Sequence, residues 1–191
     1  MRALHPNFIV GIGGSAGGLN AYTALLDALP SHTGMAFVIV YHVHPTANTQ
    51  LAKILSRHTN MRVMQASTTM PIQANHVYVI AQNTDLRIES GAFKVVFPRT
   101  HRNKQIDFFF ISLAASVGAR AIGIILSGYD GDGTEGCTHI KAKGGTTFAQ
   151  DKSAEVDDMP LSAQAAGCID FVLPPQEIAL ELSRISRRVI G

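Results

Sequence analysis

Short apolar runs that alternate with helical segments constrain most strongly what this chain can fold into. Most of the runs are apolar on both faces of a strand, as in a parallel sheet that helices cover on both sides. They lie at residues 8–10, 36–41, 77–80, 121–126, 146–149 and 171–173. We therefore predict an α/β fold with an open, doubly wound, mostly parallel sheet. Functional residues in such folds gather at the carboxyl ends of the strands.

Helical segments and one hairpin are expected to connect these strands. The helices are expected at residues 19–30, 50–57, 108–117, 134–143, 159–167 and 177–189. Two short runs flank Glu89-Ser90-Gly91-Ala92 and predict a β-hairpin insertion. Asp107 precedes the third helix, so we expect its carboxylate to cap that helix. With 191 residues and no linker or internal repeat, the chain is expected to form a single domain over residues 1–191.

The composition argues against several classes of protein. No apolar stretch reaches the roughly 18 residues that a membrane-spanning helix needs, so no membrane insertion is expected. The N-terminus lacks the long apolar core of a signal peptide, which makes the cytoplasm the expected location. A net charge of +2 is too small to indicate a nucleic-acid partner. Cys137 and Cys168 have no metal-ligand spacing, so we expect both thiols to stay reduced and structural.

A glycine-rich turn follows the first strand and leads directly into a helix. Within it, Gly13-x-Ser15-x-Gly17 has the pattern of a nucleophile elbow, in which a sharp strand-to-helix turn exposes a serine hydroxyl. The flanking glycines permit positive φ and close packing. Backbone N–H groups at the start of the new helix, that of Ala16 among them, are then placed to hold a developing oxyanion.

The same turn is also a loose dinucleotide-binding loop, since it contains Gly11-x-Gly13-x-x-x-Gly17. A nucleotide site should be supported by an acidic residue at the end of the second strand, where it would bind the ribose hydroxyls. That strand ends at Tyr41 and is followed by His42, with no acid in reach. The second strand therefore favours the nucleophile over the nucleotide site.

Histidines and aspartates follow two further apolar strands. His42 and His44 come directly after the second strand, and Asp130 and Asp132 follow the most apolar strand. With Ser15 on the same rim, these are the residue types of a hydrolytic triad. His42 is the expected base, His44 is its rival, and one aspartate would orient the imidazole. A divalent-metal site made from the two pairs is a weaker alternative, because no further ligand cluster is present.

Together these segments resemble a known family, the chemoreceptor protein-glutamate methylesterases (CheB-type catalytic domains). The resemblance extends from about Phe8 to Ile185, over almost the whole chain. It is carried by residues 13–18, 40–45, 76–80, 100–102, 126–133, 149–151 and 159–163. Within the family, residues 126–128, 159–162 and 170–175 look most like the variant fused to a receptor methyltransferase and sensor modules.

The resemblance implies a role for each residue of the candidate triad. The glycine-rich turn is similar to the family's nucleophile motif, with Ser15 at the catalytic serine. The segment after the second strand is similar to the family's histidine segment, which puts the catalytic histidine at His42 rather than His44. The loop after the most apolar strand is similar to the family's Thr-Gly-Met-Gly-x-Asp-Gly loop, which assigns the triad acid to Asp132.

The resemblance also implies a reaction in chemotaxis signalling. Ser15 would attack the γ-glutamyl methyl ester of a receptor helix, release methanol and leave an acyl-enzyme, which water activated by His42 would hydrolyse. Family members also deamidate particular glutamines by this chemistry, and no cofactor is required. The resemblance favours the Ala16 N–H as oxyanion donor. Tyr129, where the family usually has Met, is expected to line the pocket.

Three departures from the family pattern bear on activity. The family's receiver domain is expected to be missing, so phosphorylation is not expected to relieve inhibition within this chain. Asp130 replaces a usual glycine and adds a negative charge close to Asp132, and a positive φ there would cost about 1 kcal/mol. Asn103 stands where the family often has Pro. The alternative function is therefore a weakly active or inactive module that binds receptor helices or a methyltransferase partner.

Overall fold

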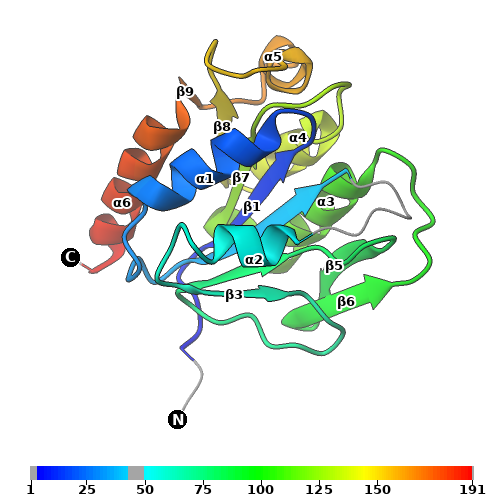
Figure 1. The fold of residues 1–191 in the computed structure, drawn as a ribbon, viewed down its shortest axis with the longest axis vertical. Helices are drawn as coiled ribbons and strands as arrows, with labels where there is room; N and C mark the ends of the chain where they lie inside the picture. Colours follow the sequence, from blue (N-terminus) through cyan, green and yellow to red (C-terminus); the bar gives the residue numbers. More distant parts are fainter. Residues whose placement is uncertain (1–3, 43–49, 191) are drawn as a thin grey trace.

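A seven-stranded parallel sheet forms the centre of the molecule (Figure 1). The computed structural model describes residues 4–42 and 50–190. Neighbouring strands all pair in parallel, in the order β3-β4-β2-β1-β7-β8-β9. The strands are β1 (Ile9–Gly14), β2 (Ala36–Tyr41), β3 (Arg62–Gln65), β4 (His76–Val79), β7 (Ala121–Ile125), β8 (Thr146–Gln150) and β9 (Phe171–Leu173).

Helices cover both faces of the sheet, and each face has its own apolar core. One core contains side chains from α1, α2 and α6, and the other contains side chains from α3, α4 and α5. Figure 1 shows α1 beside α6 on one side of the sheet. The helices are α1 (Gly18–Ala28), α2 (Leu51–Leu55), α3 (Gln105–Val117), α4 (Thr134–Ala142), α5 (Asp158–Ala165) and α6 (Pro175–Ile190). The predicted doubly wound α/β fold is confirmed.

The predicted hairpin is also present, as a separate antiparallel pair. It consists of β5 (Asp85–Glu89) and β6 (Ala92–Val96), and β5 packs on α3. Among the described residues, no helix combines the length and apolar character needed to cross a membrane.

Strand β1 lies where the direction of the sheet reverses. It pairs with β2 on one side and with β7 on the other, and later strands continue outward in both directions. In open α/β sheets, ligands bind beyond the carboxyl ends of the strands at this switch point. A site is therefore expected on the segments that follow β1, β2 and β7.

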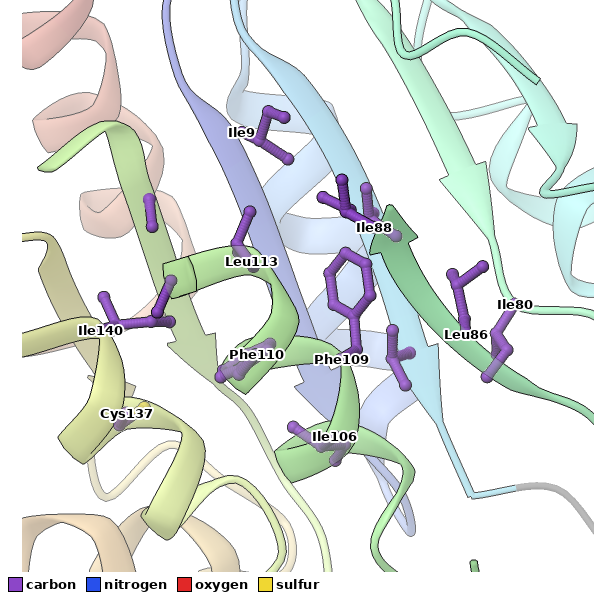
Figure 2. Close-up of a cluster of buried hydrophobic side chains, with 14 of the residues drawn as sticks. Ile9, Ile80, Leu86, Ile88, Ile106, Phe109, Phe110, Leu113, Cys137 and Ile140 are labelled. Carbon is purple, nitrogen blue, oxygen red and sulfur yellow. The ribbon is translucent and has the colours of Figure 1, made fainter. Parts of the chain in front are cut away.

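Two glycines within the central strands allow α3 to approach the sheet closely. Gly11 of β1 and Gly123 of β7 are register partners, and the ring of Phe110 lies against both. A Cβ on Gly11 would lie 2.6 Å from this ring, and one on Gly123 would lie 3.1 Å from it. Figure 2 shows Phe110 on α3 in the core beside Leu113 and Ile106. These glycines are therefore required by packing, not by backbone conformation.

The prediction for Asp107 is wrong in an informative way. The helix begins at Gln105, so Asp107 lies inside its first turn, and only 3% of the residue is exposed. Its carboxylate accepts hydrogen bonds from the N–H groups of Gly133 and Gly136, at the start of α4. The first N–H groups of α3 are occupied instead by Asp132. A local capping rule could not show this exchange, because it depends on how α3 packs against α4.

Candidate active site

Ser15 lies in the sharp turn between β1 and α1. Its N–H donates to the Ser127 carbonyl at 2.8 Å, and its own carbonyl accepts from the Gly18 N–H at 3.0 Å. Gly17 caps α1 with a φ of 72°, a left-handed conformation that favours glycine. A Cβ on Gly128 would lie 3.0 Å from the Ser15 Cβ, so the loop after β7 packs directly on the serine. This geometry has the form of the predicted nucleophile elbow.

The Ala16–Gly17 peptide is fixed by Ser127. The Ser127 hydroxyl donates to the Ala16 carbonyl at 2.7 Å and accepts from the Val156 N–H at 3.0 Å. Gln150 in turn accepts the Ser127 N–H at 3.0 Å. Within residues 4–42 and 50–190, the Ala16 N–H has no hydrogen-bond acceptor. Ser127 and Gln150 were not singled out from the sequence, although a serine directly after the most apolar strand is a signal of a buried polar contact.

His42 and Asp132 form the closest polar contact of the site. The His42 Nε2 lies 2.6 Å from the Asp132 Oδ2, and the Asp132 side chain is fully buried. The carboxylate also accepts the N–H groups of Ile106 and Asp107, at 3.0 and 2.9 Å. These groups form the N-terminus of α3, whose dipole favours a negative charge there. The Asp132 carboxylate therefore accepts two backbone N–H groups, and His42 donates its Nε2–H to it.

This contact assigns different tasks to the two ring nitrogens. Because Nε2 carries the hydrogen that Asp132 accepts, Nδ1 is the nitrogen with a free lone pair. No hydrogen bond joins the Ser15 hydroxyl to the His42 ring in the described part of the chain. Catalytic hydrogen bonds of this kind are often long without substrate and shorten in the reacting complex.

Asp130 lies on the other side of the histidine ring. Its Oδ2 is 3.7 Å from the His42 Nδ1, and its Oδ1 accepts the Asp132 N–H at 2.8 Å. Its φ is 68°, so the residue that replaces a usual glycine does adopt the left-handed conformation. Asp130 therefore stabilises the loop after β7 through the Asp132 N–H. It also faces His42 Nδ1, the nitrogen that would take a proton from Ser15.

We expect removal of the Asp130 charge to raise kcat/KM for ester hydrolysis. The Asp130 carboxylate lies 3.7 Å from Nδ1, so it competes with the Ser15 hydroxyl for the position beside that nitrogen. A partly exposed pair is worth about 1 kcal/mol or less, so Asp130→Asn and Asp130→Gly should raise kcat/KM by up to about fivefold. Asn keeps the bond to the Asp132 N–H, whereas Gly removes both that bond and the strain. Steady-state kinetics in which both variants stay at or below the parent would show that Asp130 does not compete.

The other residues predicted from the sequence lie at the surface, in the core or outside the described part of the chain. Tyr129 precedes Asp130 and is 61% exposed, so its side chain lies at the surface of the rim. Its role in a pocket stays a prediction. His44 lies outside the described residues. Cys137 and Cys168 are both free and buried, as expected of reduced thiols. Among described residues, no three or more His, Cys, Asp or Glu side chains group as metal ligands would.

Comparisons with known proteins identify relatives of this chain. The family model described as CheB methylesterase matches residues 10–182. A Leptospira interrogans protein, named provisionally as a protein-glutamate methylesterase/protein-glutamine glutaminase, is 34% identical over 172 residues, which are 88% of this chain and 89% of that protein. Protein-glutamate methylesterase/protein-glutamine glutaminase 2 of Burkholderia lata is 37% identical over 185 residues, 94% of this chain but only 54% of its own length.

A solved structure extends the similarity to three dimensions. The crystal structure of the Thermotoga maritima CheB methylesterase catalytic domain superposes with a TM-score of 0.85 at 28% identity. The match covers 93% of this chain and 98% of that domain. The chain therefore belongs to the CheB methylesterase family.

Proposed function

We propose that this chain is a protein-glutamate methylesterase that hydrolyses γ-glutamyl methyl esters on the cytoplasmic helices of chemoreceptors. The observation that carries the proposal is the contact between His42 and the fully buried Asp132 carboxylate beside the Ser15 elbow. The names of its relatives support the same activity and add hydrolysis of glutamine side chains. The chain is one catalytic domain in this proposal, and it acts in the cytoplasm without a metal or other cofactor.

In the proposed mechanism, Ser15 is the nucleophile and His42 moves the proton. The Ser15 Oγ attacks the ester carbonyl as His42 Nδ1 takes the hydroxyl proton, and Asp132 stabilises the imidazolium through Nε2. The Ala16 N–H donates to the carbonyl oxygen as it becomes negative. Collapse of the tetrahedral intermediate breaks the C–O bond to methoxide, which takes the proton from His42 and leaves as methanol. Water then repeats the sequence on the acyl-enzyme and releases glutamate.

The exposed apolar residues near the serine are the proposed contact with the receptor helix. Tyr129 is 61% exposed on the loop that packs on Ser15, and Leu161 on α5 is 51% exposed. The two segments are adjacent, since a Cβ on Gly131 would lie 2.9 Å from the Ser162 hydroxyl. An apolar rim beside the nucleophile suits one face of an amphipathic helix.

A second candidate function is a weakly active module that binds receptor helices or a methyltransferase partner. The observation that favours it is the Asp130 carboxylate opposite His42 Nδ1. The chain spans 54% of the Burkholderia lata relative, which supports a setting in which this domain works beside other modules.

Methanol release from a methylated receptor fragment tests the proposal directly. We expect release by the parent protein and a loss of at least about 10³-fold in kcat for Ser15→Ala. Ser183→Ala is the matched control, because among the described residues the Ser183 hydroxyl bonds only the Ala179 carbonyl within α6. This variant should match the parent. Binding of the fragment without release by parent or variant would favour the second candidate. Release that persists in Ser15→Ala would show that another group is the nucleophile.

A further inference from the structure

Asp107 and Asp132 are both buried, and each accepts backbone hydrogen bonds from the start of the other's helix. Asp132 precedes α4, yet its carboxylate accepts the N–H groups of Ile106 and Asp107 in α3. Asp107 belongs to α3, yet its Oδ1 accepts the N–H groups of Gly133 and Gly136 at 2.9 and 2.8 Å. The two helix N-termini are therefore locked together by a reciprocal pair of carboxylates.

One of these bonds acts on the peptide next to the proposed triad acid. The Gly133 N–H belongs to the peptide that joins Asp132 to Gly133, so Asp107 fixes the orientation of that peptide. Gly133 has a φ of 97°, and this left-handed residue turns the chain into α4. Without an acceptor at this point, the buried N–H would be unpaired, and the loop would be free to move the Asp132 carboxylate.

We propose that Asp107 is a positioning residue that holds the Asp132 carboxylate against His42 Nε2. The inference rests on the proposed function, because it assigns Asp107 a part in the same reaction. Asp107 does not touch the serine or the substrate in this assignment. It acts through two contacts, the N–H group of the Asp132–Gly133 peptide and the Gly136 N–H in the first turn of α4.

The surroundings of Asp107 indicate that its shape matters more than its charge. Burial raises the pKa of Asp107, and the nearby negative charge of Asp132 adds to this effect. The charged and titratable groups around it are Asp132, Lys104, whose Nζ lies 3.6 Å from Oδ2, and the two cysteines, Cys137 and Cys168. Among described residues, Oδ2 has no hydrogen-bond partner. An asparagine keeps the Oδ1 acceptor and puts an NH₂ group in the place of Oδ2.

The test compares two substitutions of Asp107 with a matched control. Asp107→Ala removes the acceptor and is expected to lower kcat for methanol release about 10–100-fold, the scale of a small misplacement of reacting groups. KM should stay within about threefold, because no substrate contact is lost. Asp107→Asn should restore kcat to within about threefold of the parent.

The control is Asp85→Ala, in another buried carboxylate. Asp85 is fully buried on β5 and accepts the N–H groups of Thr100 and His101 at 2.8 and 3.2 Å. Asp85→Ala should lower the unfolding temperature. It should leave kcat unchanged when kcat is measured well below that temperature. If Asp85→Ala and Asp107→Ala have equal stability and show the same loss of kcat, Asp107 is only a structural residue. That result would overturn the inference.

A proton NMR spectrum separates this inference from the proposed function. The His42 Nε2 hydrogen bonded to Asp132 should give a strongly downfield resonance in the parent, in Asp107→Asn and in Asp85→Ala, and it should move upfield or disappear in Asp107→Ala. This measurement needs no substrate. If the resonance behaves in this way but the parent releases no methanol, the proposed function fails and the positioning role stands. If the resonance is unchanged in Asp107→Ala, the positioning role fails whatever the activity.

Discussion

Asp132→Asn is expected to lower kcat for ester hydrolysis about 10⁴-fold, the size of effect that the same change has in serine-protease triads. Asn keeps the volume of the side chain but removes the negative charge that stabilises the His42 imidazolium. Two donors, His42 Nε2–H and the Ile106 N–H, converge on one carboxylate oxygen, and the Asp107 N–H meets the other. An amide can present its oxygen to only one of these positions. Its NH₂ group must then face an N–H in either orientation.

The Asp132→Asn amide group that faces a backbone or ring N–H also predicts a moderate loss of stability. One buried donor loses its acceptor, which costs about 1–3 kcal/mol, so the variant should still be folded at room temperature. Kinetics and urea unfolding should be measured on the same samples. Asp157→Asn is the control, because Asp157 is exposed before α5 and its side chain makes no capping hydrogen bond. If Asp132→Asn keeps kcat within about tenfold of the parent, Asp132 is not the triad acid, and Asp130 would be the next candidate.

The fold and the candidate residues follow from local patterns in the sequence. Apolar runs on both faces of a strand predict a covered parallel sheet, and that sheet is present with its hairpin insertion. Polar residues directly after such runs predict a site at the carboxyl ends, and His42 and Asp132 do meet there. The placement works because β2 and β7 are the two neighbours of β1, so three strand ends converge on one point.

The roles of the aspartates could not be read from spacing alone. Asp130 and Asp132 both follow β7, and the structure separates them by environment, since Asp132 is buried on the α3 N-terminus and Asp130 is exposed. Asp107 was expected to cap its own helix, but its partners Gly133 and Gly136 lie 26 and 29 residues further along the chain. Contacts of this kind depend on the packing of two helices, which no local pattern contains.

Phe110→Ala is expected to destabilise the protein by about 3–5 kcal/mol, the usual cost of removing a large buried ring. The ring is fully buried and contacts glycines from β1, β7 and α4. Glycines offer no side chain that could relax into the space, so the cavity should remain largely open. The expected fall in unfolding temperature is about 10 °C for a chain of this size, measured by calorimetry. Phe97→Ala is the control, since Phe97 is 73% exposed and should change stability by less than about 0.5 kcal/mol.

A double-mutant cycle with Gly11 tests whether the Phe110 ring stabilises the protein by filling the space beside that glycine. A Cβ at residue 11 would overlap the Phe110 ring at 2.6 Å, so Gly11→Ala alone should be destabilising, by about 1–3 kcal/mol for an overpacked core. In the Phe110→Ala background the same methyl group enters the cavity, and its cost should vanish or become a gain. The two effects should therefore be strongly non-additive. Additive losses would mean that Gly11 is needed for its backbone and not to admit the ring, and the close approach of α3 to the sheet would then need another cause.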